Sequence, residues 1–180
     1  MNKLKRYAVV LLVIGELRRK GSCCGETHIQ KTVYFLERLF EGVLDYQFIL
    51  YKYGPFSFDL RDDLGIMESM GVIKVVSQPS HSPKIIPSKL AKKVKELFPK
   101  TLTCVKEKVE FITDKLASKN VFELETLATS LYVESKLSNN SDLEKAQEIT
   151  RLKPHVSFRE ASEKLKEVKQ ILEDANRLCF

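Results

Sequence analysis

Strand-forming patterns in this 180-residue chain are confined to one stretch, from Tyr46 to Ile86, and this limits the fold more than any other feature. Aromatic and β-branched residues alternate over 46–53, and two further runs, 72–76 and 84–86, flank a polar turn over 78–83. The two later runs are typical of a β-hairpin. Apolar residues outside this stretch recur at helical spacing. We therefore expect an α+β fold that is mostly helical.

The first half of the chain carries clear helix boundaries. Gly21 and Gly71 fit the left-handed position past a helix end, and Ser57 and Ser88 are suitable N-caps. Thr27 and Gln30 have the spacing of a capping box. The predicted helices cover 4–20, 28–41, 58–70 and 88–98. The order is helix, helix, strand, helix, β-hairpin, helix, which is that of a winged helix, in which the lone strand pairs with the hairpin.

The second half of the chain lacks strand patterns, and we expect a bundle of three or four helices there. The predicted helices cover 101–119, 122–137, 142–152 and 157–178. The turns between them are short. The expected organisation is therefore a winged-helix-like half, 1–99, packed with a helical half, 100–180, in one compact unit.

The last helix has a heptad-like seam. Its apolar positions are Ala161, Leu165, Val168, Leu172, Ala175 and Cys179. The seam is shorter than the ~3 to 4 heptads of a typical coiled coil. Two interpretations stay open: it packs on the rest of the chain, or it forms a homodimer through Ala161, Leu165, Val168 and Leu172.

Net charge, cysteine spacing and the length of the apolar runs bear on the partners and the cellular compartment of the protein. Lys and Arg total 30 against 24 Asp and Glu, and the net charge of +6 is too small to identify a partner. The four cysteines form no Cys-x-x-Cys pair, which fits a reducing cytoplasm. The apolar run 7–14 is far shorter than the ~20 residues of a membrane span. We expect a cytoplasmic protein without a membrane partner.

Residues that carry chemistry are scattered along the chain. His28, His81 and His155 lie far apart, and Cys23 with Cys24 is most simply two thiols in a turn. Phosphate-binding glycine loops and nucleophile motifs do not occur. We therefore expect no catalytic residues, no metal, no cofactor and no enzyme activity.

The segment from Tyr51 to Ser57 is the most distinctive, because it combines three aromatic residues with a glycine, a proline and a helix cap. One interpretation is a rigid corner that sets the strand against the third helix. The other is an edge that binds a partner. The candidate partner-binding residues are Gln30, Lys31, Tyr34, Lys52, Tyr53, Gly54, Pro55 and Ser57.

The third helix is acidic, which bears on DNA binding. Asp59, Asp62 and Asp63 share one face at about 100° per residue, and carboxylates there would repel phosphates. Positive charge lies instead between 72 and 120, where eleven lysines face four acids. A solvated lysine face is one explanation. The alternative is weak nucleic-acid binding through Lys84, Lys89, Lys92 and Lys93.

Several segments resemble a known family. The run 30–36 resembles the Q-K-x-x-Y-L-x helix of YwgA-like proteins, and 46–60 resembles their Y-x-F…Y-x-Y-G-P-Y-S-x-x-L signature, which 63–73 continues. The runs 124–129 and 152–154 resemble the family's L-E-L-x-A-T helix and L-K-P turn. Similar residues occur in SocA-like antitoxin domains, called Panacea. Phe56 stands where YwgA-like proteins commonly have tyrosine.

The resemblance implies a small cytoplasmic module without established catalysis, often encoded near mobile or defence elements. We therefore expect a non-catalytic interaction module that is antitoxin-like and binds a protein partner, such as a toxin or defence effector. The alternative is a winged-helix regulator that binds DNA or RNA through the lysine-rich hairpin and fourth helix.

Overall fold

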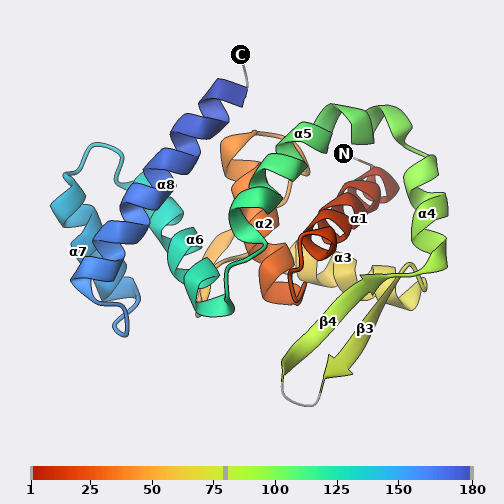
Figure 1. Ribbon diagram of the computed structural model, residues 1–180, viewed down its shortest axis with the longest axis horizontal. Helices are drawn as coiled ribbons and strands as arrows, with labels where there is room; N and C mark the ends of the chain where they lie inside the picture. Colours follow the sequence, from red (N-terminus) through yellow and green to blue (C-terminus); the bar gives the residue numbers. More distant parts are fainter. Residues whose placement is uncertain (1, 79–80, 179–180) are drawn as a thin grey trace.

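The computed structural model describes residues 2–78 and 81–178, so part of the predicted 78–83 turn and Cys179 lie outside the described residues. The fold is α+β and mostly helical, as predicted (Figure 1). The helices are α1 (Lys3–Arg19), α2 (Glu26–Leu39), α3 (Phe58–Ser69), α4 (Lys89–Glu96), α5 (Pro99–Leu116), α6 (Val121–Lys136), α7 (Asp142–Leu152) and α8 (Phe158–Leu178). The strands are β1 (Ile49–Tyr51), β2 (Gly54–Phe56), β3 (Ile73–Gln78) and β4 (His81–Pro87).

Helix α1 is the centre of the N-terminal half. It contacts α2, α4, α5 and β4, and its middle residues from Tyr7 to Leu11 are all buried (Figure 1). This contact on several sides explains why the 7–14 run is apolar throughout. The helix ends before Gly21, whose φ of +83° confirms the predicted left-handed stop.

The strand pairing differs from that of a winged helix. The predicted lone strand is instead a hairpin of two short strands, β1 and β2, which pair with each other and not with the later hairpin, and β3 pairs only with β4. Tyr51 lies opposite Gly54, so Lys52 and Tyr53 form the tip of a tight hairpin. The reason is local: Gly54 adopts a φ of +92°, which turns the chain straight back on itself.

The start of α2 also differs from the prediction. The helix begins at Glu26 with Gly25 as N-cap, so Thr27 and Gln30 do not form a capping box. Gln30 instead uses its side chain to bind a distant segment, as described below. Predicted caps elsewhere are confirmed: Ser57 accepts a hydrogen bond from the Leu60 N–H at 3.3 Å. The Ser88 hydroxyl likewise accepts from an N–H at the start of α4.

The main hydrophobic core draws on both halves of the chain. It combines α1 and α2 with α5, α6 and the C-terminal part of α8. A second, smaller cluster lies among α6, α7 and α8 and consists of Val133, Ala146, Ile149, Val156, Ala161 and Leu165. Helices α5, α6 and α7 therefore hold α8 on the chain.

This packing decides the role of the heptad-like seam. Ala161, Leu165 and Val168 are fully covered within the chain, and Leu172 packs against the main core. The seam therefore packs on the rest of the chain, which is the first of the two interpretations, and its buried residues offer no surface for the alternative, a homodimer. The physical reason is that α6 and α7 already supply the apolar surface that a second copy would have offered.

Candidate functional site

The structure brings the predicted partner-binding residues together at one corner, where α2 holds the β1–β2 hairpin. The Gln30 side chain donates to the Ser57 carbonyl at 2.9 Å and accepts from the Ser57 N–H at 3.0 Å. Lys31 Nζ donates to the Pro55 carbonyl at 2.8 Å. These bonds satisfy backbone groups of Pro55 in β2 and of Ser57, the N-cap of α3 directly after β2, from a neighbouring helix. Gln30 and Lys31 thus fix the hairpin in place.

Lys31 is a buried cation with a perturbed acidity. Burial lowers the pKa of Lys31 to about 8, and the negative charge of Glu125 opposes part of this shift. Glu125 also forms an ion pair with Lys153 at 3.5 Å, and both of these side chains are largely buried. Lys31 therefore serves mainly as a hydrogen-bond donor to the Pro55 carbonyl of the hairpin.

Helix α6 packs against β2 of the same hairpin. A Cβ atom added at Gly54 would lie 2.8 Å from Thr129 Oγ1 and 3.3 Å from the Glu125 carbonyl oxygen. Such a distance is below any normal contact, so only glycine fits between the hairpin and α6. Close packing and the positive φ thus select the same residue.

Exposure separates the eight predicted residues into two groups. Those that hold the corner are buried: Gln30, Lys31, Tyr34, Gly54, Pro55 and Ser57. Lys52 and Tyr53 at the hairpin tip are exposed, and Tyr53 has 65% of its surface in contact with solvent. A partner could therefore contact the tip directly, but the other six residues only through changes in the hairpin.

Apolar side chains gather around this tip. Tyr51 is 46% exposed, and its ring lies 5.6 Å from that of Phe58 and 6.0 Å from that of Phe56. Ile49 and Tyr53 are also exposed. We call Ile49, Tyr51, Tyr53 and Phe58 the hairpin patch.

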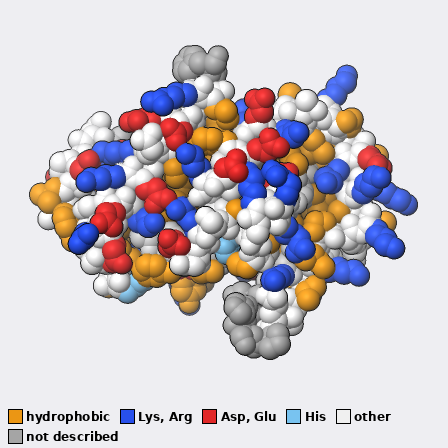
Figure 2. Space-filling view, viewed as in Figure 1, with side chains coloured by type: hydrophobic (Ala, Val, Ile, Leu, Met, Phe, Trp, Pro, Cys, Tyr) orange, Lys and Arg blue, Asp and Glu red, His pale blue; other side chains and the backbone are white. Residues whose placement is uncertain are grey.

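The predicted lysine group lies at a different place. Lys89, Lys92 and Lys93 are exposed on α4, and Lys84 is half-buried on β4. Figure 2 shows Lys and Arg side chains gathered over α4 at the right edge of the molecule. Only Lys92 has a nearby acid, Glu96 at 3.8 Å, among the described ion pairs of these four lysines.

Asp63 does not share an exposed face with Asp59 and Asp62, contrary to the sequence prediction. It is buried and accepts hydrogen bonds from Tyr46 Oη at 2.8 Å and Tyr7 Oη at 3.2 Å. Arg6 Nη1 lies 3.5 Å from its carboxylate. The edge of α3 that carries Asp63 faces these partners and not solvent, so the exposed surface of the helix is less acidic than predicted.

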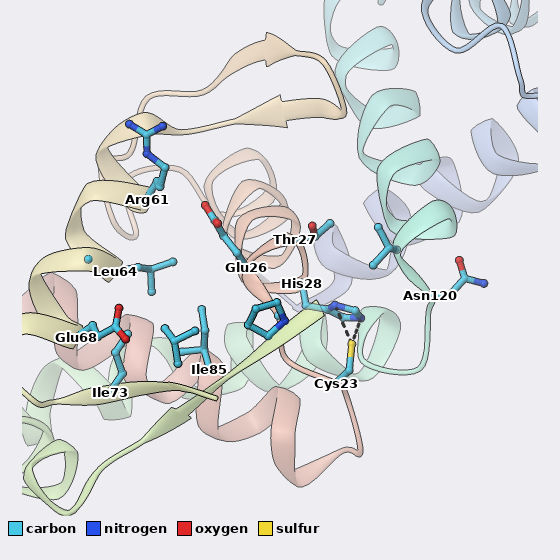
Figure 3. Close-up of a pocket in the computed structure, with 15 residues that line it drawn as sticks. Cys23, Glu26, Thr27, His28, Arg61, Leu64, Glu68, Ile73, Ile85 and Asn120 are labelled. Atoms are coloured by element: carbon cyan, nitrogen blue, oxygen red, sulfur yellow. Dashed lines mark hydrogen bonds between the residues drawn. The ribbon is translucent and has the colours of Figure 1, made fainter. Parts of the chain in front are cut away.

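A pocket of about 640 Å³ lies between the start of α2, α3 and the β3–β4 hairpin. In Figure 3, Leu64 comes from α3 and faces Ile73 and Ile85 of the hairpin, while His28 and Cys23 border another side of the pocket. The volume falls within the range of small-molecule sites. The wall formed by the two strands and α3 is mostly apolar.

The pocket contains one pair of reactive side chains. Cys23 Sγ lies 3.4 Å from His28 Nδ1 and 3.6 Å from Nε2, and His28 Nε2 lies 3.0 Å from the Lys119 carbonyl oxygen. Because a carbonyl only accepts, the ring carries its proton on Nε2 and leaves a lone pair on Nδ1. Burial lowers the pKa of His28, which favours this neutral form.

This pair does not stand out in the sequence, where Cys23 and His28 both fit a purely structural role. One local signal is Gly25, which can begin a helix at Glu26 and so place Cys23 just before the first turn that carries His28. Nothing in the sequence pointed to Lys119, which is 91 positions from His28. The side chain of His81 lies outside the described part of the chain.

Other site classes find no support in the described residues. No group of three or more His, Cys, Asp or Glu side chains within residues 2–78 and 81–178 could hold a metal ion. No helix in this part of the chain is long and apolar enough to cross a membrane. A comparison of the sequence with models of protein families and with curated proteins finds no match.

Proposed function

We propose that the chain is a cytoplasmic interaction module that binds a protein partner through the hairpin patch. The observation that carries this proposal is the exposure of Tyr53 and Tyr51 on a hairpin that buried side chains hold in place, Lys31 at Pro55 and Gln30 at Ser57 directly after the hairpin. Tyrosines are frequent hot spots of interfaces. A hairpin that is already ordered loses little entropy on binding, which favours affinity.

The resemblance to YwgA-like proteins and Panacea domains supports the same proposal. Its most specific part, residues 30–73, includes both α2 and the hairpin that α2 holds. We therefore propose that the chain is the antitoxin-like member of a pair and that its partner is a toxin or a defence effector. The closeness of Gly54 to α6 extends this corner into the helical half, where the resemblance continues at 124–129.

The test begins with recovery of a partner from native lysate, with and without nuclease, followed by calorimetry with the purified partner. We expect the double substitution Tyr51→Ala and Tyr53→Ala to weaken binding about 30-fold, the effect of losing one hot spot of about 2 kcal/mol. Leu143→Ala is the matched control, because Leu143 is 58% exposed on α7, outside the patch. Equal affinity of the double variant and the wild type would contradict the proposal.

The alternative function is binding of DNA or RNA through Lys84, Lys89, Lys92 and Lys93. The observation that favours it is the group of exposed lysines on α4, which follows the β3–β4 hairpin directly. Four phosphate contacts would lose roughly two decades of affinity between about 50 and 200 mM salt. Fluorescence anisotropy with random duplexes tests this, and Lys89→Glu with Lys93→Glu should abolish the binding. Selective nanomolar binding that depends on Arg61 would instead indicate that α3 reads the DNA.

A further inference from the structure

The Cys23–His28 pair has the parts of an activated nucleophile. The Lys119 carbonyl fixes the Nε2–H tautomer, which leaves Nδ1 unprotonated at 3.4 Å from Cys23 Sγ. Because Sγ is almost as far from Nε2, at 3.6 Å, the exposed Cys23 side chain has to rotate slightly to bring its thiol onto the Nδ1 lone pair. A nucleophile next to a base, with the base oriented by a third group, is the arrangement that nucleophilic catalysis requires. Because His28 is buried, its ring cannot readily leave this position.

The other described cysteines lack this environment. Cys24 is buried, and burial raises the pKa of its thiol to about 12. Cys104 is exposed, but no histidine side chain of the described residues forms a hydrogen bond with it. Cys23 alone among these three combines exposure to solvent with contact to an imidazole.

The start of α2 completes the surroundings of the thiol. Gly25, the N-cap, has no side chain to accept from the first-turn amides, and Gly25, Glu26 and Thr27 all line the pocket. The first N–H groups of a helix have no intrahelical partner and carry a partial positive charge. They are therefore suited to stabilise a negative oxygen that forms beside Cys23.

The rest of the pocket indicates the chemistry of the ligand. Leu64, Ile73, Val75 and Ile85 form an apolar wall in the same cavity as the thiol (Figure 3). A ligand that places an electrophilic carbon at the sulfur and an apolar chain on this wall would use both features. We infer that Cys23 accepts, with His28 as base, the acyl group of an activated ester or thioester whose apolar chain lies on this wall.

The transfer balances without any further reactant. The thiol proton moves to His28 Nδ1, the sulfur forms a bond to the carbonyl carbon, and the carbonyl oxygen becomes negative. When this adduct collapses, the bond between carbon and the leaving oxygen or sulfur breaks, and the leaving group takes the proton from His28. The products are a thioester on Cys23 and a free alcohol or thiol. The step is a single covalent acylation of the chain, and it does not involve the hairpin patch.

The probe is p-nitrophenyl hexanoate, compared with p-nitrophenyl acetate, on the full chain. We expect one equivalent of p-nitrophenolate and one hexanoyl group per chain by intact mass, both lost in Cys23→Ala and retained in the control Cys104→Ala. His28→Gln should acylate about 100-fold more slowly, which is the lower end of a general base contribution. Circular dichroism shows whether this variant is folded.

The comparison of the two esters tests the pocket without any substitution. The hexanoate should react at least about tenfold faster than the acetate relative to their rates with N-acetylcysteine, since its longer chain is buried on the apolar wall. Equal relative rates for the two esters would overturn the role of the pocket. Adducts spread evenly over Cys23 and Cys104, or a folded His28→Gln variant that reacts like the wild type, would overturn the role of the pair.

Discussion

Replacing Gly54 with alanine tests how tightly α6 holds the β1–β2 hairpin. Alanine would have to adopt the φ of +92° that Gly54 has, and its Cβ would lie 2.8 Å from Thr129 Oγ1. The substitution should therefore lower the unfolding free energy in two separate ways. The first belongs to the backbone of Gly54 itself, and the second to the contact between two segments far apart in sequence.

The expected loss of stability is large. A left-handed conformation costs a residue with a Cβ roughly 1 to 2 kcal/mol. Overpacking of a well-packed contact adds about 1 to 3 kcal/mol, because the nearby Glu125 carbonyl is backbone and cannot move freely. The sum, about 2 to 5 kcal/mol, is a substantial part of the ~5 to 15 kcal/mol that stabilises a typical protein.

A matched glycine separates the two penalties. Gly42 has a φ of +72°, and an added Cβ there would meet no atom within 4 Å. Gly42→Ala should therefore lose only the backbone part, about 1 to 2 kcal/mol. Urea denaturation followed by circular dichroism measures both variants. The difference between them is the penalty of the contact with α6.

Removing the clashing atom provides a second check. Thr129→Ala in the Gly54→Ala background should recover part of the loss, so the two substitutions should not be additive. The single Thr129→Ala variant completes the cycle. If Gly54→Ala destabilised the protein no more than Gly42→Ala does, the close approach of hairpin and helix would not contribute to stability, and the reasoning would be refuted.

Three further predictions concern the same corner and its surroundings. Ser57→Ala should lower the unfolding free energy by about 0.5 to 2 kcal/mol, because it removes the N-cap of α3, and thermal denaturation measures this. Asp63→Asn should cost about 3 kcal/mol in urea denaturation, since Arg6 and Tyr46 lose their charged partner, and an unchanged midpoint would contradict a structural role. The pKa of Lys31 is about 8 when folded and 10.5 in its ordinary range, so the unfolded chain binds more protons between these pH values. Unfolding free energy should therefore rise by about 3 kcal/mol from about pH 8 to 10.5, and Lys31→Met should flatten this rise. Below about pH 10, where most tyrosine hydroxyls are still protonated, about 2 of these 3 kcal/mol should be measurable.

Local signals predicted the helices well. Gly21 and Gly71 both adopt positive φ values at the ends of α1 and α3, and Ser57 caps α3 as its side chain suggested. These features depend on a few neighbouring residues, so they can be recognised in sequence alone. The strand pairing could not be recognised in this way. The turn at Gly54 is local, but the hairpin it forms is held by Lys31 and Gln30, which bind Pro55 and Ser57 across 24 and 27 positions of sequence.

The two candidate sites also differ in how far the sequence alone reveals them. Tyr53 could be selected from sequence because its segment is unusual in composition. The Cys23–His28 pair could not, because its geometry requires both the exact start of α2 and a carbonyl from the loop before α6. Gln30 and Tyr34 were also candidate partner-binding residues, but both are buried. Their distinctive sequence pattern reflects how the corner packs.

The smaller hydrophobic cluster among α6, α7 and α8 has a consequence for how the molecule opens. Ala146 and Ile149 of α7 belong to it, whereas none of the residues of α7 belongs to the main core. Segments that share no core can unfold as separate cooperative units. Helix α7 should therefore exchange its amide hydrogens through a partial opening that leaves α1 and α2 protected, at a free energy below that of global unfolding. In native-state hydrogen exchange, α7 would then report on a different process from the one that denaturation of the whole chain measures.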